Sequence, residues 1–412
     1  MTKNPARRFT GFTRTPDYLP LVRTPIPGPR SRALARQLRR YESQNVTFIS
    51  RRWPIFWKRA AGANVWDVDG NRYVDLTAAF GVASVGHNNP RVVAAIQEQS
   101  RQLLHAMGDV HPNELKLKLA RELCELTFKG PSRAVFGNSG AEAVEIALKT
   151  AVMHTKRAGI IAFTGAYHGL TYGALDATSR DDFRNPFLEQ LGHFTAHVPY
   201  GKLPEVETIQ QCGAVIVEPI QGRGGIVVPP DDFLPALRKF CDRHKLVLIF
   251  DEIYSGFCRT GRWFAFEHWN VMPDIICVGK GMTGGFPMSA CVGRAKIMDS
   301  WPASKGEAIH TSTFLGNPLG CAASLAAIAE MKRHKLDQRA AELGDYIKSR
   351  LPVRGKGLML GLPVRDAFRL CQELLRAGTL ALPEGEHNEV LGLTPPLTVS
   401  RRQLDFAIGL LR

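Results

Sequence analysis

The stretch Leu246-Val247-Leu248-Ile249-Phe250-Asp251 is a continuous apolar run that ends on a carboxylate. A second run, Ile275-Ile276-Cys277-Val278-Gly279-Lys280, ends on a lysine. Apolar runs of this kind, separated by helical patterns such as residues 232–244, are typical of strands in a mostly parallel sheet that is covered on both faces. Ligands of such α/β sheets bind at the carboxyl ends of the strands, so the two runs predict a site that contains Asp251 and Lys280.

The residue types at these two strand ends are those of a pyridoxal phosphate (PLP) site. A lysine nucleophile needs a partly desolvated position that lowers its pKa, and glycines surround Lys280 in the sequence. Asp251 would keep the ring nitrogen of the cofactor protonated, so that the ring can accept the electron pair released at the substrate carbon. Each residue also has an ordinary explanation, since such an aspartate often caps a helix and such a lysine is often solvated.

A glycine-containing turn, Asn138-Ser139-Gly140, lies between a short strand pattern and a helical pattern. A phosphate fits there because Gly140 lets the backbone approach closely, Ser139 and free amides donate hydrogen bonds, and the helix dipole adds positive charge. Such turns are also common without a ligand. Farther along, Tyr167 follows the strand pattern of residues 159–163 and could stack on a pyridine ring, although Tyr167 and His168 also fit as ordinary core residues.

Taken in order, these segments resemble the class III, or omega, aminotransferases, which are fold-type I PLP-dependent enzymes. The resemblance extends from about Trp53 to the C-terminus. It implies a large domain with a mostly parallel seven-stranded sheet covered by helices, and a small α+β domain built from both chain ends. The motifs that carry it are Trp66-Asp67-Val68-Asp69-Gly70-Asn71-Arg72-Tyr73-Val74-Asp75, Gly86-His87, Asn138-Ser139-Gly140-Ala141-Glu142-Ala143, Tyr167-His168-Gly169, Glu218-Pro219-Ile220-Gln221-Gly222, Asp251-Glu252-Ile253, Arg259-Thr260-Gly261, Gly279-Lys280-Gly281, Thr311-Ser312-Thr313-Phe314-Leu315-Gly316-Asn317-Pro318 and Leu393-Thr394-Pro395-Pro396-Leu397.

The resemblance and the sequence patterns together predict how the chain is divided. The expected parts are a basic N-terminal arm at 1–43, the first part of the small domain at 44–85, the large PLP-binding domain at 86–317 and the rest of the small domain at 318–412. The expected local elements are helices over residues 30–43, 90–104, 112–126, 232–244 and 318–350, and a hairpin over residues 64–76 that turns at Asp69-Gly70.

The resemblance also assigns roles to matched residues. Lys280 would hold the cofactor as a Schiff base and then move a proton between the substrate carbon and the cofactor carbon, while Asp251 would pair with the pyridinium. Thr313 would reach the phosphate from a neighbouring subunit, which implies a homodimer with shared active sites, or a tetramer built from it. The other expected cofactor contacts are Ser139, Gly140 and Ala141 at the phosphate, Tyr167 and Ile253 on the two ring faces, Glu218 at the side of the ring, and His168.

Departures from the family pattern concern the substrate. Many members have a glutamate after the Glu-Pro-Ile-Gln-Gly motif, paired with an arginine before the Thr-Pro-Pro motif that binds the substrate carboxylate; here these positions are Arg223 and Gly392. Arg223 is therefore a candidate for binding a carboxylate from the other wall, or else it points to solvent. Tyr254 replaces the usual glutamine, and its hydroxyl is expected near the cofactor's phenolic oxygen. Phe80 is the second candidate substrate residue.

The predicted function is a PLP-dependent aminotransferase that moves an amino group from an amine or amino acid donor to a 2-oxo acid by a ping-pong mechanism. A racemase, an aminomutase or a phospho-lyase would use the same site chemistry, because facial access and the leaving group decide among them. A more distant alternative is a non-catalytic scaffold whose basic arm binds nucleic acid. Retention of Lys280, Asp251 and Thr313 argues against that scaffold.

Composition and charge fit a globular enzyme. The 412 residues are 44% hydrophobic and 22% charged, and the net charge of +15 is concentrated near the N-terminus, since residues 1–60 hold 14 Lys and Arg against only Asp17 and Glu42. This arm could contact an acidic partner, but a dimer-wrapping role with solvated arginines is favoured over nucleic-acid binding, because aromatic residues are not interleaved. The eight cysteines form no Cys-x-x-Cys pair and no apolar run could span a bilayer, so neither a metal nor a membrane is expected and the expected compartment is the cytoplasm.

Overall fold

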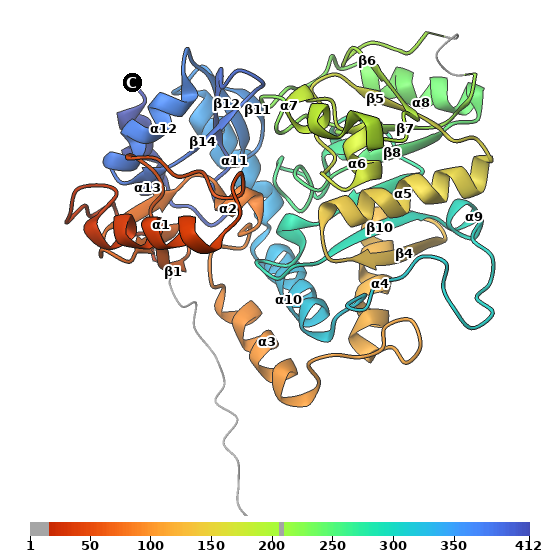
Figure 1. Ribbon diagram of the computed structural model, residues 1–412, viewed down its shortest axis with the longest axis horizontal. Coiled ribbons are helices and arrows are strands. Elements are labelled where there is room, and N and C mark those ends of the chain that lie inside the picture. Colours follow the sequence, from red (N-terminus) through yellow and green to blue (C-terminus); the bar gives the residue numbers. More distant parts are fainter. Residues whose placement is uncertain (1–15, 206–209) are drawn as a thin grey trace, which may run out of the picture.

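The computed structural model describes residues 16–205 and 210–412. Figure 1 shows two lobes, one built around a seven-stranded sheet and the other from elements of both chain ends. Among the described residues, no helix is long and apolar enough to cross a membrane. Residues 1–15, the first part of the predicted basic arm, lie outside the described residues.

The seven-stranded sheet confirms the predicted mostly parallel α/β fold. Its strand order is β4-β10-β9-β8-β7-β5-β6, and β10 is the strand that runs antiparallel to its neighbours β4 and β9. The carboxyl ends of the remaining strands therefore meet at one edge of the sheet. The strands are β4 (Ser132–Gly137), β5 (Gly159–Phe163), β6 (Thr195–Val198), β7 (Cys212–Val217), β8 (Val247–Asp251), β9 (Ile275–Val278) and β10 (Ser289–Arg294).

Helices cover both faces of this sheet, as alternate residues of a central strand demonstrate. Ile249 of β8 packs in one core cluster with residues of α5 (Gly140–Thr155), whereas Leu248 packs in the opposite cluster with α4 (Glu114–Thr127) and α8 (Phe233–His244). Burial on both faces explains the continuous apolar runs. Among the described residues, the other helices between β3 and α10 are α2 (Ala78–Gly81), α3 (Pro90–Gln102), α6 (Tyr172–Ala177), α7 (Asp181–Arg184), η1 (Asn185–Gln190), η3 (Ala265–His268), η4 (Lys280–Met282) and α9 (Ala295–Met298).

The second lobe contains two four-stranded sheets and joins both ends of the chain. In the sheet β1-β2-β3-β13, Thr379 pairs in parallel with Val74. The predicted hairpin is β2–β3, and Gly70 in its turn has a φ of +87°, which favours glycine. The strands are β1 (Trp57–Ala61), β2 (Asn64–Asp67), β3 (Arg72–Asp75), β13 (Thr379–Leu380) and, in the sheet β11-β12-β15-β14, β11 (Arg354–Lys356), β12 (Met359–Pro363), β14 (Leu382–Glu384) and β15 (Val390–Leu393); α12 (Ala367–Arg376) and α13 (Arg401–Leu410) accompany them.

The prediction of a single helix over residues 318–350 is wrong. The structure has α10 (Pro318–His334) and α11 (Leu336–Lys348), and between them Lys335 adopts a left-handed conformation with a φ of +47°. Both helices bury apolar residues in the same core cluster, so the chain must change direction between them. No glycine or proline marks this change, which is why the helical pattern looked continuous.

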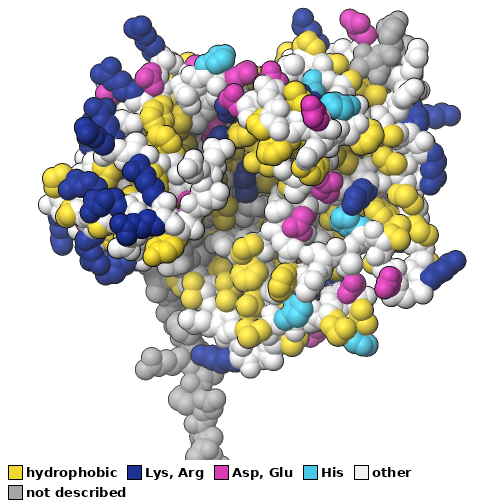
Figure 2. All heavy atoms as spheres, viewed as in Figure 1, with side chains coloured by type: hydrophobic (Ala, Val, Ile, Leu, Met, Phe, Trp, Pro, Cys, Tyr) yellow, Lys and Arg dark blue, Asp and Glu magenta, His cyan; other side chains and the backbone are white. Residues whose placement is uncertain are grey.

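The described part of the basic arm packs against its own chain. Helix α1 (Pro29–Tyr41) begins at the hairpin turn, where the Asp69 carboxylate accepts hydrogen bonds from the amides of Arg30 at 2.7 Å and Ser31 at 2.9 Å. This carboxylate satisfies two of the free amides that every helix start presents. Lys and Arg side chains gather over the lobe that carries α1 (Figure 2), and the exposed arginines of this helix include Arg32, Arg36, Arg39 and Arg40.

Candidate active site

A cavity of about 310 Å³ lies at the carboxyl ends of β7, β8 and β9. A larger cavity of about 620 Å³ beside α9 contains none of the predicted site residues, so chemistry rather than size identifies the site. The surface is hollowed between the two lobes (Figure 2). The predicted residues that line the 310 Å³ cavity are Ser139, Gly140, Ala141, Tyr167, His168, Glu218, Arg223, Asp251, Ile253, Tyr254 and Lys280.

Lys280 lies two residues after the end of β9, in an uncommon backbone conformation. Its φ is +41°, and it begins the short turn η4 instead of extending the strand. Its Nζ lies 4.0 Å from the centroid of the Tyr254 ring. Burial lowers the pKa of Lys280, against the opposing effect of the Asp251 carboxylate. A lowered pKa increases the share of neutral amine, which is the nucleophilic form of a lysine.

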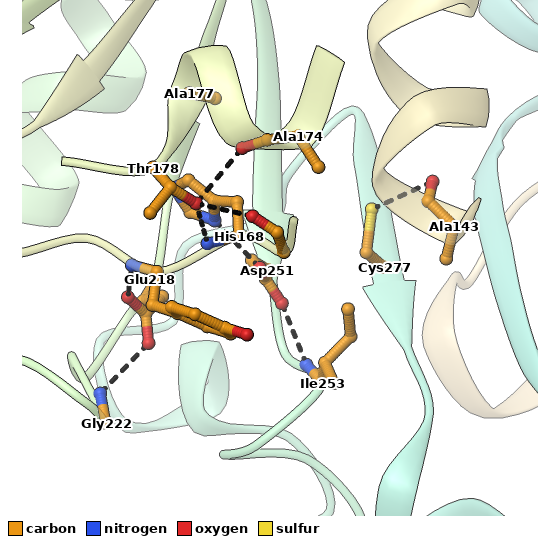
Figure 3. Close-up of polar contacts among 12 residues, drawn as sticks. Ala143, His168, Ala174, Ala177, Thr178, Glu218, Gly222, Asp251, Ile253 and Cys277 are labelled. Atoms are coloured by element: carbon orange, nitrogen blue, oxygen red, sulfur yellow. Dashed lines mark hydrogen bonds and ion pairs between the residues drawn. The ribbon is translucent and has the colours of Figure 1, made fainter. Parts of the chain in front are cut away.

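Asp251, the last residue of β8, is held in a defined orientation. Its Oδ2 lies 2.8 Å from Nδ1 of His168, and its Oδ1 accepts a hydrogen bond from the amide of Ile253 at 3.1 Å. The carboxylate lies between these two partners (Figure 3). His168 is itself fixed, since its amide donates to Oγ1 of Thr178 at 2.9 Å. A buried carboxylate needs such partners, and they leave the cavity with a carboxylate of fixed orientation.

Glu218 follows β7 and connects the backbone at Tyr167 to the backbone at Gly222. Its Oε1 accepts a hydrogen bond from the amide of Tyr167 at 3.0 Å, and its Oε2 accepts one from the amide of Gly222 at 2.9 Å. Burial raises the pKa of Glu218 to about 7, although both amide bonds favour the ionised form. The Tyr167 ring also packs edge-on against Phe183, with 5.6 Å between ring centroids. Tyr167 is therefore placed by both its backbone and its ring.

The turn between β4 and α5 can take an anion. Ser139 is the N-cap of α5, and its Oγ accepts a hydrogen bond from the Glu142 amide at 3.3 Å. A Cβ at Gly140 would lie only 2.9 Å from Cδ1 of Ile253, so a glycine is required for this close approach. The first amides of a helix lack intrahelical partners and carry its positive dipole end. This turn fits the phosphate of PLP, the oriented carboxylate of Asp251 fits its ring nitrogen, and Lys280 fits its aldehyde.

Two predicted residues do not line the cavity of their own chain. Thr313 is exposed, although the neighbouring Ser312 accepts a hydrogen bond from Nδ2 of Asn138 at 3.0 Å. Phe80 is 54% exposed on α2, and three consecutive residues, 78–80, have left-handed backbone angles. The roles expected for Thr313 and Phe80 therefore stay predictions.

Tyr254 is in the cavity, but its hydroxyl has a partner elsewhere. The hydroxyl oxygen lies 3.1 Å from Oγ1 of Thr394, and the ring lies beside Lys280. A Cβ at Gly81 would come 2.7 Å from the Tyr254 ring, so α2 packs closely against it. The side chain thus links the lysine to Thr394, a contact that the sequence pattern did not indicate.

Glu384 is a residue near the cavity that sequence reasoning missed. It ends β14, its side chain is 1% exposed, and its Oε2 lies 3.8 Å from Nε of Arg223. No motif surrounds it. Glu384 could have been predicted only from the pairing of β14 with β15, which places Leu382 opposite Gly392. The register of two strands depends on long-range contacts, so a local sequence pattern does not indicate it.

Comparison with known proteins identifies the family. The family model for class-III aminotransferases matches residues 48–412, so the chain belongs to this family. Acetylornithine aminotransferase of Methanopyrus kandleri is 40% identical over 369 residues, covering 87% of this chain and 93% of that protein. Putrescine aminotransferase of Pectobacterium atrosepticum is 37% identical over 377 residues, covering 85% of this chain and 80% of that protein.

Solved structures agree with this assignment. The crystal structure of ornithine aminotransferase from Toxoplasma gondii superposes with a TM-score of 0.83 at 31% identity, covering 92% of this chain and 94% of that one. Another structure of that enzyme has PLP in part of its active sites. The protein is a PLP-dependent aminotransferase of fold type I, and it moves an amino group from a donor to a 2-oxo acid by the ping-pong scheme of its family.

Proposed function

We propose that Lys280 is the residue that binds PLP covalently and that Asp251 holds its ring nitrogen. One observation carries this proposal: β8 and β9 are neighbouring parallel strands, Asp251 ends β8, Lys280 lies two residues after β9, and both side chains line the same cavity. When bound, PLP supplies an electron sink for the carbon that carries the substrate amine. Lys280 would hold the cofactor through its neutral Nζ, and the same nitrogen would take and return the proton of that carbon.

The remaining cavity residues bind and orient the cofactor in this proposal. Ser139 and the amides of Gly140 and Ala141 hold the phosphate, helped by Thr313 of a second subunit. Tyr167 and Ile253 contact the two ring faces. Glu218 fixes the Tyr167 backbone, and His168 keeps the Asp251 carboxylate in its orientation. The support for these roles is that all of these residues except Thr313 line one cavity.

We also propose that Arg223 binds the carboxylate of the 2-oxo acid acceptor. In a ping-pong reaction donor and acceptor use the same cavity in turn, and every 2-oxo acid carries a carboxylate. Arg223 supplies a guanidinium to the cavity wall, and this group binds carboxylates through two parallel hydrogen bonds. Gly392, at the position of the family's usual carboxylate clamp, has no side chain that could do so.

The proposed donor class is a primary amine at the end of a carbon chain. The relatives are named for acetylornithine, ornithine and putrescine, which share such an amine and differ in whether they carry a carboxylate. Arg223 and Gly392 depart from the usual carboxylate clamp. The proposed donor class therefore includes terminal amines with a carboxylate and terminal amines without one.

The proposed assembly is a homodimer, because Thr313 is exposed and does not line the cavity of its own chain. We further propose the cytoplasm as the compartment, consistent with eight cysteines that form no disulfide. The proposed domain boundaries fall after residues 43, 85 and 317.

The test of this function is the absorption spectrum of the PLP-loaded enzyme during addition of terminal amines without an acceptor. We expect the visible cofactor band to bleach with one class of amine and to return after addition of a 2-oxo acid. Lys280→Ala should abolish both changes, whereas Lys296→Ala, at an exposed position remote from the cavity lining, should preserve them. A full response from Lys280→Ala would refute the assignment.

A further inference from the structure

The ion pair of Arg223 and Glu384 lies at one wall of the cavity. Arg223 lines the cavity and its side chain is 32% exposed, whereas the Glu384 side chain behind it is 1% exposed. The amide of Gly385 donates a hydrogen bond to the carbonyl of Arg223 at 3.0 Å, so the two segments are joined by their backbones as well. The guanidinium therefore faces the substrate space and the carboxylate lies on its protein side.

Glu384 occupies space that the glycine at position 392 leaves free. A Cβ at Gly392 would lie 3.0 Å from Cγ of Glu384 and 3.5 Å from its Oε1. A large side chain at position 392 would therefore collide with the Glu384 side chain. The charges at this wall therefore come from positions 223 and 384, and position 392 supplies none.

The Glu384 carboxylate depends on Arg223 for its charge compensation. Among the described residues, Arg223 is the only cation within 4.0 Å of it, and Oε2 of Glu384 has no hydrogen-bond partner. An unpaired buried carboxylate is costly, and the Arg223 guanidinium is the nearest charge that offsets this cost. The contact uses Nε of Arg223, and no hydrogen bond within the described residues engages its two terminal nitrogens. Those nitrogens stay available to a carboxylate from the cavity side.

We propose that Glu384 is a specificity-determining residue: as the built-in counter-anion of Arg223, it weakens carboxylate binding to the guanidinium. This inference rests on the proposed role of Arg223. A substrate carboxylate must share the guanidinium with Glu384, and a donor without a carboxylate meets a neutral pair instead of a bare charge. The cavity thus accepts donors with a carboxylate and donors without one, and Arg223 is the residue that binds the carboxylate.

The test is a double-mutant cycle on ligand binding to the PLP-loaded enzyme. The probe is butyrate, which carries a carboxylate but no reacting carbonyl, and butyramide is its neutral counterpart; calorimetry gives both dissociation constants. Glu384→Gln should tighten butyrate binding about tenfold, because the guanidinium loses its competing anion. In an Arg223→Gln background the same change should have almost no effect. Butyramide binding should change little in any variant.

Each outcome separates the two proposals. Unchanged butyrate binding in Arg223→Gln would remove Arg223 from the carboxylate site and with it the substrate part of the proposed function. Weaker binding in Arg223→Gln, together with no tightening in Glu384→Gln, would leave Arg223 in place and overturn the role of Glu384. Glu386→Gln is the matched control, because Glu386 is exposed in the same hairpin and should leave every constant unchanged.

The pH dependence of butyrate binding gives a second readout. Burial raises the pKa of Glu384 to about 7, and Arg223, Lys280 and Arg180 oppose this while Glu218 adds to it; Tyr254 is a further titratable neighbour. Below pH 7 the protonated carboxyl no longer competes, so the wild-type enzyme should bind butyrate more tightly there than at pH 8. The difference should shrink in Glu384→Gln, and an equal difference in both proteins would contradict the proposal.

Discussion

Glu252 illustrates at the scale of one residue how burial and hydrogen bonding compete. It follows Asp251, and its carboxyl oxygens accept hydrogen bonds from the amides of Ala265 at 3.0 Å and Phe266 at 2.8 Å, with Ser255 as a third donor. Burial nevertheless raises the pKa of Glu252 from 4.5 to about 7. Glu218 and Glu384 reach similar values, so three buried carboxyl groups titrate near neutrality.

These carboxyl groups predict that the protein loses stability as the pH rises from about 4.5 to 7. In this range the unfolded chain releases a proton that the folded state retains, so the free energy of unfolding falls, by on the order of 3 kcal/mol for one such group. The contribution is fully present below pH 4.5 and lost above pH 7. Glu252→Gln cannot titrate, and its thermal midpoint should therefore fall less steeply over this range than that of the wild type. Parallel curves for the two proteins would contradict the raised pKa of Glu252.

At the scale of secondary structure, most elements could be predicted because their signal is local. Three helices are expected at residues 90–104, 112–126 and 232–244. Their expected last residues lie within two residues of the observed ends of α3, α4 and α8. The break between α10 and α11 and the pairing of β14 with β15 could not be predicted, since core packing and strand register determine them. The same distinction applies to the site: strand ends and a glycine turn placed Asp251, Lys280 and Gly140 in one cavity, whereas Glu384 arrives there only through register.

The break at Lys335 gives a test at this scale. A lysine in the left-handed region is strained by about 1 kcal/mol, and glycine avoids the strain at the cost of a more flexible unfolded chain. We expect Lys335→Gly to unfold at a slightly higher temperature than the wild type. Arg333→Gly, two residues earlier in the last turn of α10, should unfold at a lower temperature, because glycine is a poorer helix former than arginine. The reverse order of the two variants would mean that the turn between the helices is not strained.

At the scale of the whole molecule, two features are an uneven charge and the position of Thr313 outside the cavity of its own chain. Thr313 is expected to complete the phosphate site of a second subunit, and Lys and Arg side chains of the described residues gather over the lobe that carries α1 (Figure 2). The described part of the arm is fixed on its own hairpin, where Leu21 pairs with Arg72. The dimer-wrapping role of the arm and the domain boundaries stay predictions, and residues 1–15 of the arm lie outside the described residues.

Subunit complementation tests the shared site. Thr313→Asp should be inactive because a carboxylate repels the phosphate, and Lys280→Ala should be inactive because it lacks the nucleophile. After the two proteins are unfolded and refolded together, the mixed dimer contains one complete site, so about a quarter of the wild-type activity should return under random pairing. Either variant refolded alone is the control. No recovery from a mixture that contains mixed dimers would show that Thr313 does not act across the interface.

The most direct test of the central claim is to trap the cofactor on its lysine. The PLP-loaded enzyme is reduced with borohydride, digested and examined by mass spectrometry, with Lys280→Ala treated in parallel. We predict a phosphopyridoxyl group on Lys280 in the wild type and none in the variant. Modification of a different lysine in the wild type, or the same extent of labelling in the variant, would contradict the assignment of Lys280.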